Sequence, residues 1–178
     1  MTDHLDERTY DIFFGIQRSV RYHLHRRRFY EQWNTITVAA GVFGGSSAVA
    51  AAFANAPFWS ASLAAGVAII SALDLAVGTA KMANVHSDLA RQFMSLQKHF
   101  ADDKNLTDEA YANIVCERLT IEQSEPTPLR LLDALCHYEL LRAMGDTTQP
   151  PRIPFWRRFV QHFFSQAAYT RTTVFSGE

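Results

Sequence analysis

Basic and imidazole side chains gather just before a long uncharged stretch of the chain, and these residue types could bind an anion. The cluster consists of Arg21, His23, His25, Arg26, Arg27 and Arg28. Guanidinium groups match the oxygens of phosphate through paired hydrogen bonds, so the cluster could hold a phosphate-bearing ligand. The same charges could instead orient a membrane protein and contact anionic lipid. The residue types favour the lipid interpretation, and the phosphate ligand stands as its alternative.

Further basic side chains follow the uncharged stretch and complete a set of candidate ligands for phosphate or a nucleotide. The set comprises Arg21, His23, Arg26, Arg27, Arg28, Lys81, His86 and Arg91. His86 falls on an apolar stripe, where a histidine is either a hydrogen-bonded core residue or a sensor of protons or phosphate. The core role is the simpler interpretation of His86.

Asp74 is an ionisable residue within an otherwise apolar segment. Such a residue is a functional candidate, because a charge is costly to place in lipid. Asp74 lies seven residues before Lys81, which is about 10 Å along a helix. It could therefore line an aqueous lumen, form an ion pair with Lys81 or an arginine of the first helix, or reach the inner interface. The candidate pore and gating residues are Ser46, Ser47, Ser71 and Asp74.

The sequence lacks the motifs of common enzymes and metal sites. There is no P-loop, Gly-x-Ser-x-Gly, Cys-x-x-Cys or His-Glu-x-x-His pattern. His23 and His25 would point to different faces of a helix, and Cys136-His137 has no second pair of ligands. We therefore expect no catalytic residue, no cofactor and no metal. The net charge of −1 gives no reason to expect binding to duplex nucleic acid.

The stretch that must position these residues runs from Gln32 to Leu73 without a single Asp, Glu, Lys or Arg. Pro57 cannot continue a helix and divides the run into two segments, 35–54 and 58–80. Each segment is close to the roughly 20 residues that cross a hydrocarbon core. The pattern predicts a transmembrane helical hairpin, and a pair of buried helices in a soluble protein is the alternative.

Small residues recur along both predicted spans. The candidate helix-packing residues are Gly41, Gly45, Ala64, Ala68 and Ala72, and the alanine series continues to Ala76 and Ala80. Such ridges let helices approach closely in lipid. They could pack the hairpin against itself, but a second small face favours contact with other copies. We expect a homo-oligomer, with a tetramer as the favoured number.

The distribution of charge and aromatic residues predicts the orientation. Basic residues flank the hairpin on the side of the two termini, whereas the turn around Pro57 is uncharged. By the positive-inside rule, both termini face the cytoplasm. Aromatic residues expected at the membrane interfaces are Phe29, Tyr30, Trp33, Phe58 and Trp59.

The remaining segments predict helices outside the membrane. One helix is expected over 3–33, and a second helix should run unbroken from about Phe58 to Ala101. Its polar half carries an apolar stripe at 3.5-residue spacing. The stripe consists of Met82, His86, Leu89, Phe93, Leu96 and Phe100.

Two shorter helices and a terminal one should follow. Thr107 is expected to cap a helix that runs to about Ser124. Its expected buried residues are Tyr111, Ile114, Val115 and Leu119. Thr127 should cap the next helix, with Pro128 in its first position and an end near Gly145. A last helix is expected over 154–166.

The predicted fold class is therefore an all-α membrane protein with a two-helix transmembrane hairpin, whose long helices extend into a cytoplasmic helical bundle. The predicted parts are an N-terminal cytoplasmic helix (1–33), the hairpin (34–80), a cytoplasmic helical module (81–168) and a flexible tail (169–178).

Two stretches that flank the uncharged run carry a resemblance to a known family. They read Arg21-Tyr22-His23-Leu24-His25-Arg26-Arg27-Arg28-Phe29-Tyr30 before it, and Leu73-Asp74-Leu75, Lys81 and His86-Ser87-Asp88-Leu89-Ala90-Arg91-Gln92-Phe93 after it. With the small-residue hairpin, they resemble the SLATT group, bacterial two-transmembrane effectors associated with nucleotide-signalling conflict systems. The resemblance covers about residues 10–100.

The resemblance implies an antiviral function and a location in the bacterial inner membrane. Members of this group are understood as pore-forming effectors that disrupt the membrane of phage-infected cells. A nucleotide or oligonucleotide signal, or a nucleotidyltransferase partner, usually controls them. The resemblance thus strengthens the phosphate interpretation of Arg26, Arg27 and Arg28.

Two hypotheses for function follow. The first is a gated pore assembled from several copies, in which the cytoplasmic helices transmit ligand binding to the spans. The second is a non-conducting membrane anchor whose cytoplasmic helices bind a partner protein. The anchor explains the apolar stripe without requiring a lumen.

Overall fold

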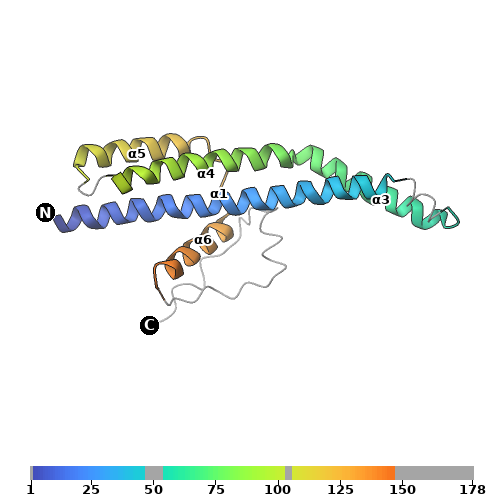
Figure 1. The fold of residues 1–178 in the computed structure, drawn as a ribbon, viewed down its shortest axis with the longest axis horizontal. Coiled ribbons are helices and arrows are strands. Elements are labelled where there is room, and N and C mark those ends of the chain that lie inside the picture. The colour runs from blue at the N-terminus through green and yellow to red at the C-terminus, as the bar shows by residue number, and fades with distance from the viewer. Residues whose placement is uncertain (1, 47–53, 103–105, 147–178) are drawn as a thin grey trace. The chain divides into compact units, whose positions relative to one another are not determined.

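The computed structural model describes residues 2–46, 54–102 and 106–146, and the described residues form helices without any strand. In chain order the elements are α1 (Thr2–Gly44), α3 (Pro57–Val77), α4 (Thr79–Asp102), α5 (Asp108–Glu122) and α6 (Arg130–Ala143) (Figure 1). The chain divides into two compact units. One comprises Met1–Tyr22 with Leu89–Glu178, and we call it the bundle unit. The other, His23–Asp88, is called the hairpin unit.

The bundle unit has an apolar core to which four helices contribute. The core residues are Ile12, Ile16 and Val20 of α1, Leu89, Phe93 and Leu96 of α4, Ile114 and Ile121 of α5, and Leu132, Leu135, Cys136 and Leu140 of α6. Of the stripe expected on α4, His86, Leu89, Phe93 and Leu96 are buried, whereas Met82 and Phe100 are half-buried. Its spacing of alternately three and four residues keeps these side chains on one side of the helix.

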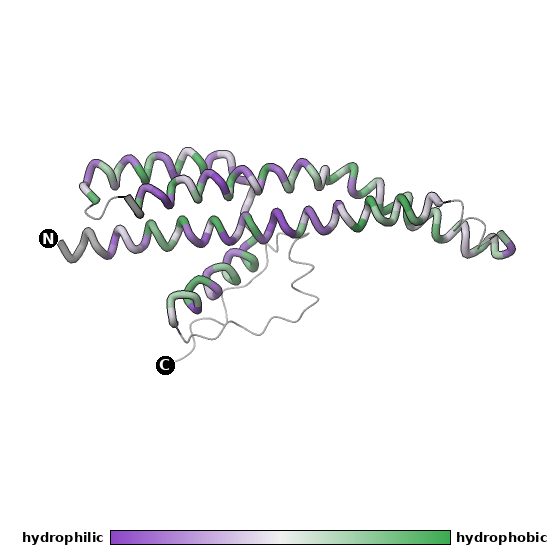
Figure 2. The backbone as a smooth tube through the Cα atoms, viewed as in Figure 1, coloured by the Kyte–Doolittle hydropathy of each residue, from purple (hydrophilic) through white to green (hydrophobic). Residues whose placement is uncertain are grey.

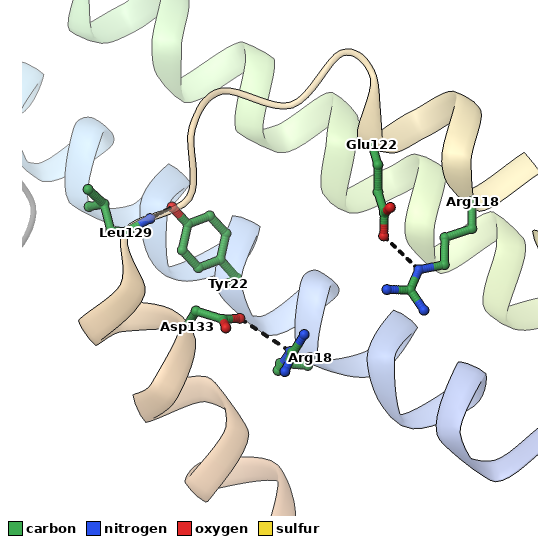
Figure 3. A network of polar contacts seen from close by, with 6 residues as sticks. All are labelled: Arg18, Tyr22, Arg118, Glu122, Leu129 and Asp133. Carbon is green, nitrogen blue, oxygen red and sulfur yellow. Dashed lines mark hydrogen bonds and ion pairs between the residues drawn. The ribbon is translucent and has the colours of Figure 1, made fainter. Parts of the chain in front are cut away.

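Polar contacts join α6 and its N-cap to α1 (Figure 3). The hydroxyl of Tyr22 accepts a hydrogen bond of 2.9 Å from the backbone N–H of Leu129. The Arg18 guanidinium lies 3.2 Å from a carboxylate oxygen of Asp133, which ties α1 to α6. A β-carbon added to Gly15 of α1 would lie 2.8 Å from the Arg118 guanidinium of α5. Glycine at this position therefore allows α5 to approach closely.

The start of α6 differs from the expectation that Thr127 caps it with Pro128 in the first position. The helix begins at Arg130, and its N-cap is Leu129, which has an extended backbone and no capping side chain. The Leu129 side chain is buried with Tyr22, Leu132 and Cys136. The contact of Leu129 with Tyr22 keeps the backbone extended beyond Thr127 and Pro128, so the helix starts later than these two residues indicate.

The N-terminus of α5 is as the sequence predicts, because the Thr107 side chain accepts a hydrogen bond of 3.2 Å from the backbone N–H of Ala110. Its expected buried face is wrong at Leu119, whose side chain is 52% exposed. Ile114 and Ile121 are the buried residues of this helix. The face that α5 presents to the core is therefore rotated away from Leu119.

The hairpin unit contains α1 from His23 onward, α3 and the first turns of α4. Helix α1 runs without a break from the polar segment into the uncharged one, rather than ending near Trp33. Its last residue packs on α3, since a β-carbon added to Gly44 would lie 2.7 Å from Val67. Pro57 opens α3, as expected for a residue that cannot continue a helix but fits its first turn.

The unbroken helix expected over 58–101 is wrong at one residue. Gly78 separates α3 from α4 and has a left-handed backbone, with φ +64° and ψ +53°. Its N–H donates to the carbonyl of Asp74 at 2.8 Å, a common way to end an α-helix. A residue in this conformation ends the regular hydrogen-bond ladder, so the second helical segment of the hairpin contains a break.

Within the described residues, one helical run is long and apolar enough to cross a membrane, Phe58–Phe100. Figure 2 shows the apolar character concentrated in α3 and in the end of α1. The first expected span, 35–54, lies only partly within the described residues, so the two-span hairpin stays a prediction. The terminal helix expected over 154–166 lies outside them.

Candidate functional site

A buried polar cluster lies where α1 meets α4 in the hairpin unit. It consists of His23, Arg26 and Tyr30 of α1 and His86 of α4, which we call the histidine node. These side chains belong to residues that are 1%, 7%, 7% and 1% exposed, respectively. The three α1 residues are spaced by three and four positions, which places them on one face of the helix. Tertiary packing against α4 then buries that face.

Two imidazoles form the centre of the node. The Nδ1 atoms of His23 and His86 lie 2.9 Å apart, within hydrogen-bonding distance. The two rings are stacked at 5.2 Å between centroids. One Nδ1 must therefore carry a proton while the other accepts it. The expectation of a hydrogen-bonded core histidine at His86 is confirmed.

Tyr30 and Arg26 complete the node. Arg26 donates a hydrogen bond to the Tyr30 hydroxyl, and its guanidinium lies 4.6 Å from the centre of the Tyr30 ring. The Tyr30 ring in turn stacks on His86 at 5.7 Å with an angle of 12° between planes. Tyr30 was expected at the membrane interface, but it is buried inside the protein. Its spacing of seven residues from His23 is the signal that could have placed it.

The electrostatics of the node favour a neutral imidazole at His86. Burial, together with the nearby His23 and Arg26, lowers the pKa of His86 from 6.5 to about 3. His86 lies beyond the apolar α3 segment, on the polar helix that follows. At neutral pH the His86 imidazole is thus neutral and lies near the Arg26 guanidinium.

The candidate phosphate ligands are not all gathered at the node. The structure brings His23, Arg26 and His86 together, whereas Arg27 pairs with Glu31 of its own helix at 2.7 Å. Arg28 and Lys81 are exposed in the hairpin unit. The other two candidates, Arg21 and Arg91, belong to the bundle unit.

Asp74 has a partner within the chain. Its carboxylate accepts a hydrogen bond from the Thr79 hydroxyl across the break at Gly78. Asp74 is half-buried, whereas Thr79 is only 2% exposed. The sequence did not single out Thr79, because a threonine five residues away has no contact with Asp74 in a regular helix.

The other pore candidates have more ordinary surroundings. The Ser46 hydroxyl donates to the carbonyl of Phe43 in its own segment. Ser71 is exposed, and Ser47 lies outside the described residues.

The small-residue ridge of α3 is exposed along its whole length. The exposed members are Ala64, Ala68, Ala72 and Ala76, and Ala80, which lies beyond the break in α4, is exposed as well. The contact of α3 with α1 instead uses Val67, which meets Gly44. Gly41 is also exposed, and a β-carbon added there would meet nothing within 4 Å. Gly45 is exposed as well and meets only the Gly41 carbonyl of its own segment.

Comparison with protein family models, curated proteins and solved structures finds no match to the chain.

Proposed function

We propose that the chain is a two-span membrane protein whose copies assemble into a pore that the cytoplasmic helices control. The observation that carries the proposal is the exposure of apolar side chains in the hairpin unit. On α3, Leu75 is 85% exposed and Ile69 is 61% exposed. On α1, Val42 and Phe43 are 68% and 71% exposed. Lipid is the environment in which such surfaces are stable.

A buried pair of helices is the competing explanation of the uncharged run. In the 18-residue apolar window of Phe58–Phe100, only 6% of the residues are buried. A core helix of a soluble domain would be mostly buried. Helix α3 has 21 residues, about 32 Å at 1.5 Å per residue, which matches the hydrocarbon thickness of roughly 30 Å. These facts support a membrane span over α3, with the end of α1 beside it.

Self-association follows from the surface that the span would present to lipid. The exposed alanine ridge allows a helix of another copy to approach closely, and it is not used by α1. Two spans cannot enclose a water path alone, so a conducting form needs several copies. In this proposal the assembly is a tetramer, and Ser71 and Asp74 face its lumen.

The control of the pore is proposed to act from the cytoplasm. The resemblance to SLATT effectors suggests an anti-phage role, with a nucleotide or oligonucleotide signal or a nucleotidyltransferase partner. Arg28 and Lys81 are exposed and could meet the phosphates of such a signal. A ligand shifts the balance of closed and open forms only by its different affinity for the two.

Leakage from liposomes tests the pore. Purified protein inserted into vesicles should release a small trapped dye and carry single-channel current, with or without added nucleotides. Ala68→Leu with Ala72→Leu should block assembly and abolish the leak, because added bulk keeps helices apart. Leu75→Phe adds bulk at the most exposed large apolar residue of α3 and should leave the leak unchanged. Verified insertion without permeability under any of these conditions would contradict the pore.

A non-conducting anchor is the second candidate, and the hydrogen bond between Asp74 and Thr79 favours it. One oxygen of the Asp74 carboxylate accepts this hydrogen bond inside the chain, so the carboxylate does not need an aqueous lumen to supply a donor. Asp74→Asn separates the two functions. A lumen residue should alter ion flux when its charge is removed, whereas an anchoring residue should alter only expression or assembly. A strictly monomeric protein in detergent would also favour the anchor.

A further inference from the structure

The two helical segments of the hairpin unit differ in continuity. Helix α1 is unbroken from His23 to Gly44, whereas the segment opposite it is interrupted at Gly78. Below the break, α4 is joined to α1 through the hydrogen bond between His86 and His23. The break therefore lies between the apolar α3 and a part of α4 that is fastened to α1.

A glycine at the break can adopt either of two conformations. Glycine has no β-carbon, so it populates the left-handed and right-handed helical regions about equally. In the right-handed form, α3 and α4 would join into one straight helix. Gly78 has open space around it, since an added β-carbon would meet only the Lys81 side chain, at 3.9 Å. Steric contacts at Gly78 therefore exclude neither the left-handed nor the right-handed conformation.

The side chains across the break distinguish the two forms. Residues five apart on a regular helix are separated by about 140° around its axis, because each residue turns about 100°. The Asp74 and Thr79 side chains would then point in different directions. Their hydrogen bond exists only when the helix is broken between them. It is a contact that one conformation makes and the other loses.

We propose that Gly78 is a hinge between α3 and α4, and that the hydrogen bond from Thr79 to Asp74 is the latch that holds the hinge in its broken form. Release of the latch straightens the helix and frees the Asp74 carboxylate. The consequence for conduction rests on the proposed pore function, in which the hinge sets how α3 and Asp74 are presented to the lumen. The conformational change itself does not depend on that function.

Distances between spin labels test the hinge directly. Ala68→Cys on α3 and Asn84→Cys on α4 place labels at two exposed positions, in a Cys116→Ser background. Cys136 can remain, because it is fully buried. In lipid vesicles, the parent should give a distance shorter than that of an unbroken helix, which spans about 24 Å between these α-carbons at 1.5 Å per residue.

Two substitutions should lengthen the distance. Gly78→Ala disfavours the left-handed conformation, and Thr79→Val removes the donated hydrogen bond at nearly constant volume. Each should move the population toward the longer distance. The matched controls are Gly66→Ala, at an ordinary helical glycine with open space, and Thr37→Val, at a buried threonine that bonds its own helix. Both controls should reproduce the distance of the parent.

Substitutions of Asp74 distinguish the effect of its hydrogen bond with Thr79 from the effect of its charge. Asn retains an oxygen that can accept from Thr79, so Asp74→Asn should keep the distance of the parent. Asp74→Leu has no acceptor and should give the longer distance. If Gly78→Ala, Thr79→Val and Asp74→Leu all reproduce the parent distance, the hinge and latch are contradicted.

Dye leakage from vesicles that hold the same latch variants without the labelling cysteines separates the hinge from the pore, because a label at Ala68 would lie on the ridge proposed for assembly. A longer distance in the latch variants, with no leakage in any variant, supports the hinge and contradicts the pore. Leakage in the parent, with no change of distance in any latch variant, supports the pore and contradicts the hinge. If the distance and the leakage change together across the variants, both the hinge and the pore are supported.

Discussion

His23 and His86 share a hydrogen bond of 2.9 Å between their Nδ1 atoms inside the hairpin unit. One imidazole donates this hydrogen bond through its Nδ1 and the other accepts it. The bond joins α1 to α4 in a region that the sequence marks as strongly basic.

Removing either imidazole should destabilise the protein. His23→Leu and His86→Leu each take away one side of a buried hydrogen bond, and we expect a loss of about 1–3 kcal/mol for each. The double variant should cost less than the sum, because both polar groups are then gone. Thermal unfolding in detergent micelles, followed by circular dichroism, measures these differences. His99→Leu at an exposed position is the control, and strict additivity of the two losses would argue against a direct bond.

The stability of the protein should fall in acid because of His86. Its pKa is about 3 in the folded protein and 6.5 in the unfolded chain, so the unfolded chain binds more protons between these values. The contribution is present in full above about pH 6.5 and is lost as the pH falls toward 3, by up to about 1.4 kcal/mol per pH unit. Unfolding midpoints across this range should show the slope. His86→Leu should reduce it and His99→Leu should not.

Tyr22→Phe should loosen the start of α6. The substitution removes the hydroxyl that accepts from the Leu129 N–H, which leaves a buried donor and costs about 1–3 kcal/mol. Hydrogen exchange at the Leu129 amide should become faster than in the parent. Tyr10→Phe is the matched control, since its hydroxyl is exposed and contacts only the sulfur of Met144 at 3.5 Å. Equal exchange at Leu129 in both variants would contradict this account.

Gly44→Ala should weaken the contact of α1 with α3. An added methyl group at 2.7 Å from Val67 overpacks the contact, at a cost of about 1–3 kcal/mol. Combining it with Val67→Ala should restore part of the loss. Gly41→Ala has open space and should be neutral or favourable by up to about 1 kcal/mol. Unfolding in micelles compares the variants, and equal effects at Gly44 and Gly41 would count against the packing.

The two cysteines should differ in reactivity and can report the orientation. Burial, together with the nearby Glu139 and Asp133, raises the pKa of the Cys136 thiol to about 12, whereas Cys116 is exposed. At pH 8, a maleimide should label Cys116 alone in the folded protein. With a membrane-impermeant maleimide, only vesicles that present the cytoplasmic face should be labelled at Cys116. Labelling of right-side-out cells would overturn the predicted cytoplasmic location of the C-terminal helices.

The sequence predicted the elements whose signal is local and periodic. The apolar stripe from Met82 to Phe100 repeats every 3.5 residues, so its buried face on α4 could be assigned without a partner in view. Thr107 likewise indicates the start of a helix, because its side chain accepts a hydrogen bond from a backbone N–H only three residues later. Pro57 marks the start of α3 through a local property as well, because proline cannot continue a helix but fits its first turn.

The features that the sequence did not predict depend on contacts between distant segments. Tyr30 was placed at the membrane interface because it is aromatic and near an apolar span, but His86, 56 positions later, determines its burial. Thr127 and Pro128 signal a helix start that the contact of Leu129 with Tyr22 overrides. A single glycine inside an apolar helical pattern is commonly tolerated, so Gly78 gave no warning of a break.

The unequal continuity of the hairpin has a mechanical consequence for a protein embedded as proposed. Bilayers differ in thickness, and a rigid rod adapts to a thinner one by tilting along its whole length. Helix α1 has that property, whereas the segment opposite it can bend at Gly78 and keep α4 in place. Lipid tail length would therefore affect the α3–α4 segment more than α1, so the thickness of the host membrane would influence the conformation of the protein.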